Sequence, residues 1–295
     1  MGILLGLTAA LCWGSADFFA RYATRLVGTY RTLFFMQFFG VVLLSLYVVL
    51  SGTWRHLFLV VDWQTWLWTC IAIALNIVSS LALYRAFEVG VLTIVSPIAA
   101  SYAAITVLLA VLAGEVISQV HGIGITASLI GVVLAATPIT WKFGAQTHLP
   151  KPPRTSRWTS GIGLAILASL GYGVAFWLFG FRVTPVLGGI LPVWLVRLVT
   201  ACVLPIFAPL THQDISIPRG RVWWYLTGVG ILDTAAFVAA TVGYTTAQVS
   251  IVSVLASLFS AVTVLLAWLF LHDRLQWNQW FGVSIIFIGV ALVNI

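Results

Sequence analysis

Long apolar runs separated by short polar stretches fill almost the whole chain. Each run has about 20 residues, the length that a helix needs to cross the hydrocarbon core of a bilayer. The apolar positions are continuous rather than alternating, which favours helices over the strands of a membrane barrel. The sequence therefore predicts an all-α membrane protein with ten transmembrane helices, at residues 3–22, 31–50, 65–86, 91–113, 119–138, 159–180, 190–209, 222–243, 248–271 and 277–294.

The composition excludes a soluble enzyme and a disordered chain. Of the 295 residues, 61% are hydrophobic and only 7% are charged, whereas soluble domains have about 25% charged residues. The net charge of +7 comes mostly from basic residues at the ends of apolar runs, which indicates membrane topology rather than nucleic-acid binding. The cysteines, Cys12, Cys70 and Cys202, form no paired motif, so we expect no disulfide, metal site or cofactor.

Basic residues are concentrated in every second loop. Eleven of them follow the first, third, fifth, seventh and ninth predicted helices, and only Arg55 and Arg182 lie in the other loops. Because cytoplasmic loops are enriched in Lys and Arg, this bias predicts that both termini face outward. We expect the membrane to be a bacterial inner (plasma) membrane.

The chain repeats itself weakly at a shift of about 158 residues. Glu115 aligns with Asp273 at this shift, and a shift of 157 aligns residues 106–110 with 263–267, both of which read TVLLA. Since each copy holds five helices, the second copy enters the membrane in the opposite orientation, an arrangement typical of secondary transporters. The sequence thus predicts two inverted five-helix repeats around a central cavity.

The longest polar stretch divides the two copies. It contains four basic residues and three prolines between residues 141 and 157. We interpret it as a linker between a first repeat at residues 1–140 and a second repeat at residues 158–295.

Several short motifs accompany this repeat, in a fixed order. They are LCWGS at 11–15, ALYRA at 82–86, Pro97, Gly114-Glu115, Gly124 and Gly131. With the ten helices they resemble the EamA branch of the drug/metabolite transporter superfamily over essentially the whole chain. The resemblance implies a central cavity and the export of small metabolites, often amino acids. The second copy departs from this pattern at Asp273, where glutamate is usual, and at Leu255, which replaces Pro97. The second helix has Gln37 where the seventh has Arg197, the position at which the family often has arginine.

Two carboxyl groups, Asp17 and Asp233, lie inside predicted helices. An ionisable side chain in lipid costs about 2.5–3.5 kcal/mol on insertion scales, so each is a functional candidate. Burial disfavours the charged form of a carboxyl group, which suits both for proton coupling or substrate binding. A structural role is the alternative for each. For Asp17 it is an ion pair with Arg21, one turn further on. For Asp233, which has no basic residue within two turns, it is a neutral side chain bonded to backbone.

Other polar and aromatic side chains predict the wall of the cavity. They are Asn76, Ser80 and Tyr84 on one face of the third helix, with Trp13, Tyr172 and Trp177 on the first and sixth helices. The aromatic residues would hold an aromatic or aliphatic side chain, and ordinary helix packing is the alternative. A stripe of serines on the ninth helix either lines the cavity or bonds to neighbouring helices. Its members are Ser250, Ser253, Ser257 and Ser260.

Arg197 is the only cation deep inside a predicted helix. It either binds a substrate carboxylate or pairs with Asp17 or Asp233. Glu115 and Asp273 stand just before short turns, and we interpret them as turn and interface residues.

These features predict a secondary transporter that exports a small metabolite, an amino acid or a related compound, by alternating access. Proton coupling through Asp17 or Asp233 is an inference from the carboxyl groups, and a uniporter, an exchanger or a multidrug cation exporter stays open. A channel and an intramembrane enzyme are weaker alternatives, because the five histidines are scattered at helix ends and loops. The expected partners are the substrate, the lipid bilayer and protons, without nucleic acid, for a monomer or a homodimer.

Overall fold

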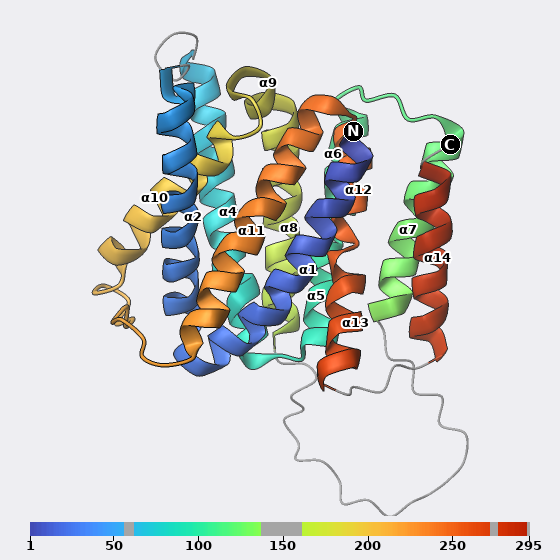
Figure 1. Cartoon of the computed structure of the whole chain (residues 1–295). Coiled ribbons are helices and arrows are strands. Elements are labelled where there is room, and N and C mark those ends of the chain that lie inside the picture. Colours follow the sequence, from blue (N-terminus) through green and yellow to red (C-terminus); the bar gives the residue numbers. More distant parts are fainter. Residues whose placement is uncertain (56–61, 137–160, 272–276, 294–295) are drawn as a thin grey trace, which may run out of the picture.

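The computed structural model describes residues 1–55, 62–136, 161–271 and 277–293, and in these ranges every regular element is a helix. The helices form one elongated bundle, and the two termini lie at the same end of it (Figure 1). The predicted linker at residues 141–157 lies outside the described residues.

The first repeat contributes five helical segments. They are α1 (Gly2–Val27), α2 (Thr29–Ser51), α4 (Trp63–Val89), α5 (Leu92–Ala100) continued by α6 (Tyr102–Leu112), and α7 (Gln119–Ala136), with a short 3₁₀ turn η1 (Thr53–Arg55) after α2.

The second repeat follows the same order. Its helices are α8 (Ile162–Leu178) continued by a π-helical turn η2 (Phe179–Val183) and α9 (Thr184–Leu187), α10 (Leu191–Phe207), α11 (Val222–Thr246), α12 (Val249–Ser257) continued by α13 (Phe259–Leu271), and α14 (Trp277–Val293).

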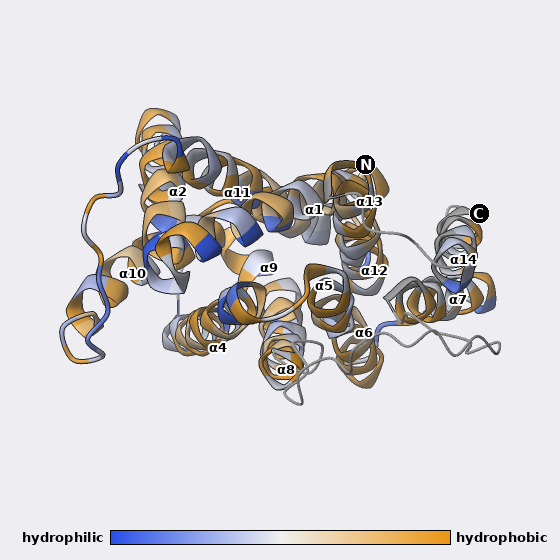
Figure 2. Ribbon diagram, turned by 90° about the horizontal axis from the view of Figure 1, so that it is seen from below, coloured by the Kyte–Doolittle hydropathy of each residue, from blue (hydrophilic) through white to orange (hydrophobic). Residues whose placement is uncertain are grey.

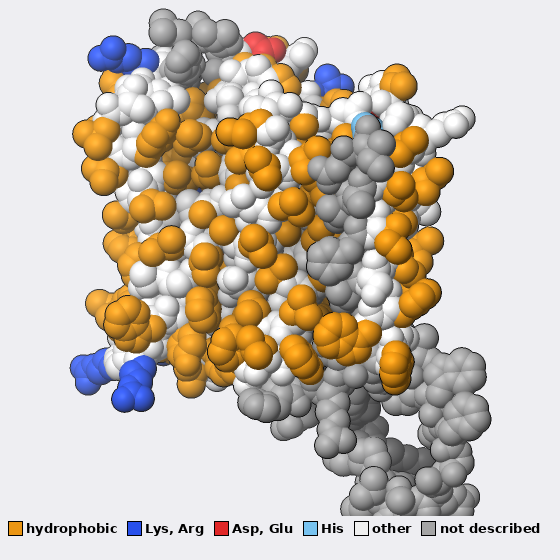
Figure 3. All heavy atoms as spheres, turned by 45° about the vertical axis from the view of Figure 1, so that its right-hand side comes forward, with side chains coloured by type: hydrophobic (Ala, Val, Ile, Leu, Met, Phe, Trp, Pro, Cys, Tyr) orange, Lys and Arg blue, Asp and Glu red, His pale blue; other side chains and the backbone are white. Residues whose placement is uncertain are grey.

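The predicted transmembrane segments each correspond to a helix or to helices placed end to end. Seven helical runs in the described part are long and apolar enough to cross a membrane, and α10 is a shorter apolar helix. At 1.5 Å per residue, the 18 residues of α7 and the 17 of α14 span about 26 Å, close to the hydrocarbon thickness. Hydrophobic side chains cover the middle of the face in Figure 3, while the Lys and Arg side chains visible there lie at its two ends.

The fourth and ninth predicted helices are each broken at matching positions. Ser101 separates α5 from α6 with φ −63° and ψ −6°, and Leu258 separates α12 from α13 with φ −63° and ψ −7°. The two positions differ by 157, the shift that aligns the repeats. Pro97 precedes the first break by four residues, but Val254 stands at the equivalent place before the second. The break is therefore a property of the repeat, which proline favours but does not require.

Two glycines bring the first helix of each repeat against the broken helix of the other. A Cβ on Gly14 of α1 would lie 2.5 Å from the Cβ of Val262, and one on Gly173 of α8 would lie 2.6 Å from the Cβ of Ile105. Ile105 and Val262 are again 157 residues apart. Gly14 and Gly173 are 159 residues apart, so the two crossings match to within two residues, and both lie beside the cavity described below.

Helices α7 and α14 pack side by side at one edge of the bundle (Figures 1 and 2). A Cβ on Gly289 would lie 2.6 Å from the backbone nitrogen of Ser128 and 2.7 Å from the carbonyl oxygen of Gly124. The fifth and tenth predicted helices are therefore closely packed at this point.

Candidate functional site

A cavity of about 50 Å³ lies among α1, α2, α4, α8, α10 and α11 and the broken helices of both repeats. This volume is enough for a few water molecules but is well below the 300–1,000 Å³ of a typical ligand pocket. The helices therefore enclose a contracted site, and a metabolite would have to part them.

The structure brings together most of the residues that the sequence singled out. Eight of the nine predicted wall residues line the cavity. They are Trp13, Asp17, Asn76, Ser80, Tyr84, Tyr172, Arg197 and Asp233. The exception is Trp177, which lies outside the cavity wall and stacks on Phe181 with ring centroids 6.0 Å apart. It lies one position beyond Phe176, which does line the cavity, because successive helical residues point about 100° apart.

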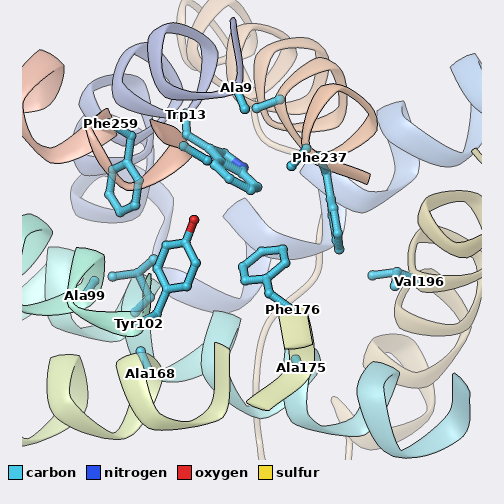
Figure 4. Close-up of a cluster of buried hydrophobic side chains, with 14 of the residues drawn as sticks. Ala9, Trp13, Ala99, Tyr102, Ala168, Ala175, Phe176, Val196, Phe237 and Phe259 are labelled. Carbon is cyan, nitrogen blue, oxygen red and sulfur yellow. The ribbon is translucent and has the colours of Figure 1, made fainter. Parts of the chain in front are cut away.

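Five aromatic rings face one another on one side of the cavity (Figure 4). The Trp13 ring centroid is 5.4 Å from that of Phe176, 6.2 Å from Phe237 and 6.3 Å from Phe259. Tyr102 closes the group, with its ring 5.0 Å from Phe176. Such separations suit the tilted and edge-on contacts that aromatic rings prefer.

Sequence reasoning missed three members of this aromatic group. Tyr102, Phe237 and Phe259 were not distinguished from the many aromatic residues of the apolar runs. The repeat does contain a signal for two of them, because a shift of 157 aligns Tyr102 with Phe259, and both directly follow the helix breaks.

A buried ion pair forms the polar part of the cavity wall, beside the aromatic group, because the Arg197 guanidinium lies 5.6 Å from the ring centroid of Phe237. Arg197 Nη2 donates to Asp233 Oδ2 at 2.5 Å, and Arg197 Nη1 donates to Gln37 Oε1 at 3.0 Å. The Arg197 side chain is 1% exposed and the Asp233 side chain 16% exposed. The carboxylate is thus the member of the pair that is more open to the cavity.

Asp233, which has no basic residue within two turns of its own helix, is therefore not an isolated carboxyl group. The basic partner comes from the neighbouring helix α10 rather than from α11 itself, so spacing along one helix does not reveal it. Of the two alternatives for Arg197, pairing with Asp233 is the one present in this conformation. Gln37 also belongs to this polar centre, although the sequence showed it only as the counterpart of Arg197.

Asp17 faces the same cavity from α1 and is 6% exposed. Its Oδ2 accepts a hydrogen bond from the Ser96 hydroxyl of α5 at 3.3 Å. With Asp233 it supplies the two carboxyl groups of the wall, and Arg197 supplies the single guanidinium.

Two neutral hydrogen bonds join other polar wall residues. The hydroxyls of Ser80 and Tyr172 lie 2.9 Å apart, which links α4 to α8. The Tyr84 hydroxyl donates to Met36 Sδ at 2.8 Å. Asn76 lines the cavity one turn before Ser80.

The serine stripe on α12 and α13 serves packing, because none of its members lines the cavity. Ser253 pairs with the Tyr244 hydroxyl at 3.1 Å, and Ser257 bonds back to its own helix. Ser250 donates both its amide and its hydroxyl to the Glu115 carboxylate. Glu115 thus joins the loop after α6 to the first turn of α12, in the other repeat, which agrees with its interpretation as an interface residue.

The described residues contain no group of three or more His, Cys, Asp or Glu side chains placed to hold a metal ion. What the cavity wall offers is a guanidinium, two carboxyls, several hydroxyls and an apolar aromatic surface. This combination can bind a small polar molecule and exchange protons.

Comparison with known proteins agrees with the fold. One solved structure, described only as a crystal structure of a protein, matches 99% of this chain and 96% of its own with a TM-score of 0.73 and 19% identity. At that identity the likeness concerns the fold alone. No curated protein matches the chain.

The family comparison covers nearly all of the sequence. The model of the EamA-like transporter family matches twice, at residues 1–137 and 159–295. Two consecutive matches agree with the two-repeat architecture of the drug/metabolite transporter superfamily. The chain is an integral, multi-pass membrane protein. The chain belongs to the EamA-like transporter family.

Proposed function

We propose that this transporter is a secondary carrier that exports a small amino compound through the central cavity and exchanges it for a proton at Asp17. The observation that carries this proposal is the charge balance of the cavity wall. Arg197 neutralises Asp233, so two ionised carboxyl groups leave one negative charge in excess. A single cation balances that excess, and a proton or a substrate ammonium group can each supply it.

Competition for one carboxyl group would couple the two movements. A proton and an ammonium group cannot both occupy Asp17, so binding of one requires release of the other. A charged donor forms a stronger hydrogen bond to a carboxylate than a neutral donor does, which favours an amine over a neutral metabolite at this position. The result is antiport, in which substrate leaves as a proton enters.

Alternating access is supported by the repeats and by the narrow cavity. Inverted repeats provide two conformations of similar geometry, one open to each side of the membrane. The close crossings at Gly14 and Gly173 are the points at which we propose that the repeats pivot against each other. The bias of basic residues supports an orientation with both termini outside, and the membrane that we propose is a bacterial inner membrane.

An amino acid or a related compound is the substrate class that we favour. The five aromatic rings provide an apolar surface for its side chain, and Asp17 provides the acceptor for its ammonium group. The second candidate is an organic cation exported as a drug, which the same aromatic surface favours through cation–π attraction.

Proton flux in proteoliposomes that enclose a pH dye tests the proposal. Amino acids, nucleosides and organic cations are added to the wild type and to Asp17→Asn, Asp233→Asn and Asp62→Asn. Asp62 is the matched control, because its carboxyl caps α4 away from the cavity and accepts from the Thr65 amide at 3.0 Å.

We expect substrate-dependent proton flux in the wild type and in Asp62→Asn, and its loss in Asp17→Asn. Asp233→Asn should weaken substrate binding while retaining coupling at saturating substrate. Equal flux in the wild type and Asp17→Asn would contradict the proton role. Labelled substrate that equilibrates without any proton movement would show a uniporter or an exchanger instead.

A further inference from the structure

Each repeat has a short link between its first and second helices that lies beside the end of its third helix. In the first repeat this link is Gly28, beside the end of α4 and opposite the termini (Figure 1). In the second repeat it begins at Gly188, beside the end of α11 and at the end of the bundle where the termini lie. Gly28 has φ 85° and ψ 164°, and Gly188 has φ 72° and ψ −175°. The two ends can therefore be compared position by position.

A carboxylate ties the link of the first repeat to α4. Glu88, the next-to-last residue of α4, accepts hydrogen bonds from the amide nitrogen and the hydroxyl of Thr29, at 3.2 and 2.6 Å. Because Thr29 is the first residue of α2, the carboxylate also lies at the positive end of that helix's dipole. Arg25 of α1 adds a bond to the carbonyl oxygen of Gly90 at 2.8 Å. We call the pair Glu88 and Thr29 the latch.

The equivalent position in the second repeat has no carboxyl group. Thr245, the next-to-last residue of α11, stands 157 residues after Glu88, and its hydroxyl donates back to its own helix at 2.8 Å. Thr245 and Gly188 instead line a cavity of about 650 Å³. The link contacts α11 one turn before its end, where the Thr241 hydroxyl donates to the carbonyl oxygen of Gly189 at 2.5 Å. A neutral contact and a cavity thus stand where the other end has its latch.

The backbone packing beside the two links is alike. A Cβ on Gly161, just before α8, would lie 3.4 Å from the Cα of Gly90. A Cβ on Gly2, the first residue of α1, would lie 3.4 Å from the Cα of Ala247, which is 157 residues after Gly90. The first helix of each repeat thus begins against the same part of the other repeat. The latch is therefore a side-chain difference between two ends with similar backbone packing.

The latch also continues a helix face that lines the central cavity. Glu88 is one turn beyond Tyr84, which lines the cavity, and residues four apart share a helix face. Tyr84 donates to Met36 of α2, which is two turns beyond Thr29. Helices α2 and α4 are therefore joined at two levels, one at the cavity and one at the latch. A substrate that enlarges the cavity by parting these helices acts on both levels.

We propose that the latch holds the ligand-free carrier closed at the end opposite the termini, so that the state open at the terminal end is favoured. Opening the latched end breaks two hydrogen bonds to a carboxylate, which are stronger than bonds between neutral groups. The corresponding contact at the other end is neutral. Glu115 also forms a charged contact at the terminal end, but it has an acidic counterpart in Asp273, whereas Glu88 has none in Thr245. Glu88 is thus a positioning residue that controls access to the cavity.

This inference rests on the alternating access of the proposed function and deepens it. The basic residues that follow the first and third predicted helices lie at the latched end, which the proposed orientation places in the cytoplasm. An exported substrate enters from that side. The ligand-free carrier then rests open to the outside, and loading of substrate requires release of the latch.

Hydrogen–deuterium exchange of the ligand-free, full-length chain in detergent micelles tests the inference, because amide exchange reports local opening. Mass spectrometry follows the latched end at residues 24–32 and 85–94, and the terminal end at residues 184–190 and 241–249. The variants that break the latch are Glu88→Met, which removes the acceptor, and Thr29→Val, which removes one donor. Thr29→Val keeps the shape of the side chain, so it decides the test alone if Glu88→Met does not fold.

Two matched controls leave the latch intact. Arg85→Gln removes the ion pair of Arg85 with Glu88, 2.7 Å long, which lies within α4 and joins no other helix. Thr245→Val changes the equivalent position of the second repeat, where the hydroxyl bonds only to its own helix.

We expect exchange at the latched end to be about tenfold faster in Glu88→Met than in the wild type, the effect of losing a hydrogen bond to a charged group. Exchange at the terminal end should become slower in the same variant, because the two ends open alternately. Thr29→Val should show both changes to a smaller extent, and both controls should match the wild type.

The slower exchange at the terminal end is the decisive result, because a contact that only stabilises the fold would not produce it. Faster exchange at the latched end alone, or no change in any latch variant that folds, would overturn the inference. So would an equal effect in Arg85→Gln, which would trace the change to charge near Glu88 rather than to its bonds with Thr29.

Failure of this inference is distinguishable from failure of the proposed function, because the exchange experiment needs neither substrate nor proton. Opposite changes at the two ends, with proton flux independent of Asp17, would support the latch and contradict the antiport. Proton flux that depends on Asp17, without opposite changes at the two ends, would leave the antiport and overturn the latch.

Discussion

Removal of Arg197 tests the electrostatic reasoning about the cavity most directly. Arg197→Met keeps a long apolar side chain but leaves the Asp233 carboxylate, 16% exposed, without its cation. Breaking a buried pair from one side is strongly destabilising, by about 3–5 kcal/mol, because the remaining charge stays buried.

The loss of stability in the variant has an upper limit that depends on pH. Asp233 in the variant can avoid the cost of a buried charge by taking up a proton. Protonating a carboxyl group of ordinary pKa, about 3.9, costs about 4 kcal/mol at pH 7 and about 1.5 kcal/mol at pH 5. The folded variant then holds a proton that the unfolded chain does not hold, so lowering the pH stabilises the variant relative to the wild type.

Thermal unfolding in detergent micelles between pH 5 and pH 7.5 measures this effect. We expect Arg197→Met to be less stable than the wild type at pH 7.5 and to recover much of the difference at pH 5. The double variant Arg197→Met/Asp233→Asn should lose that pH dependence, because its amide cannot titrate. Arg55→Met, at the exposed end of the bundle, provides the control for loss of a positive charge.

A deficit in Arg197→Met that is the same at pH 5 and pH 7.5 would refute the reasoning, because it would trace the loss to packing rather than to the Asp233 charge. Stability equal to the wild type at pH 7.5 would refute it as well, since the ion pair would then not hold the polar centre together.

Three further perturbations probe the surrounding structure. Gly289→Val should separate α7 from α14, because even a Cβ at position 289 would lie within 2.7 Å of α7 backbone atoms. We expect the thermal unfolding midpoint of this variant to be lower than that of the wild type. Glu115→Gln should lower the unfolding free energy by about 1 kcal/mol, because a charged acceptor for two Ser250 donors is lost, and hydrogen exchange at the first turn of α12 should rise. The Asp62 carboxylate accepts from the Thr65 hydroxyl and amide, and these bonds lower the pKa of Asp62 below its ordinary value. Its capping contribution is therefore present above pH 4 and lost as pH falls through the lowered pKa, so Asp62→Ala should speed exchange at the start of α4 at pH 7 and converge with the wild type in acid.

The positions of the helices were predictable because hydropathy reports them directly. The breaks at Ser101 and Leu258 were not, since apolar residues continue through both of them. A proline precedes only the first break, and the second lies where α13 packs against α1 at Gly14. Patterns along the chain record which face of a helix is polar but not the residue that meets it from a neighbouring helix.

The same limit explains what was found and missed at the site. Eight predicted wall residues meet at one cavity because polar groups inside a membrane cluster away from lipid. The partner of Asp233 was left open, because Arg197 is 36 residues away on α10 and pairing depends on the register between two helices. Gln37 went unrecognised as a partner of Arg197 for the same reason.

The two repeats also differ in charge at the polar centre. Arg197 and Asp233 in the second repeat correspond to Gln37 and Asn76 in the first, and Gln37 contacts its own counterpart Arg197. If the two access states exchange the environments of the repeats, identical repeats would give both states the same energy. Any difference in energy must come from positions at which the repeats differ, and a buried charge in place of an amide is one such position. We therefore expect the ion pair to contribute to which state is favoured, so that its removal from either side shifts the balance between the two states.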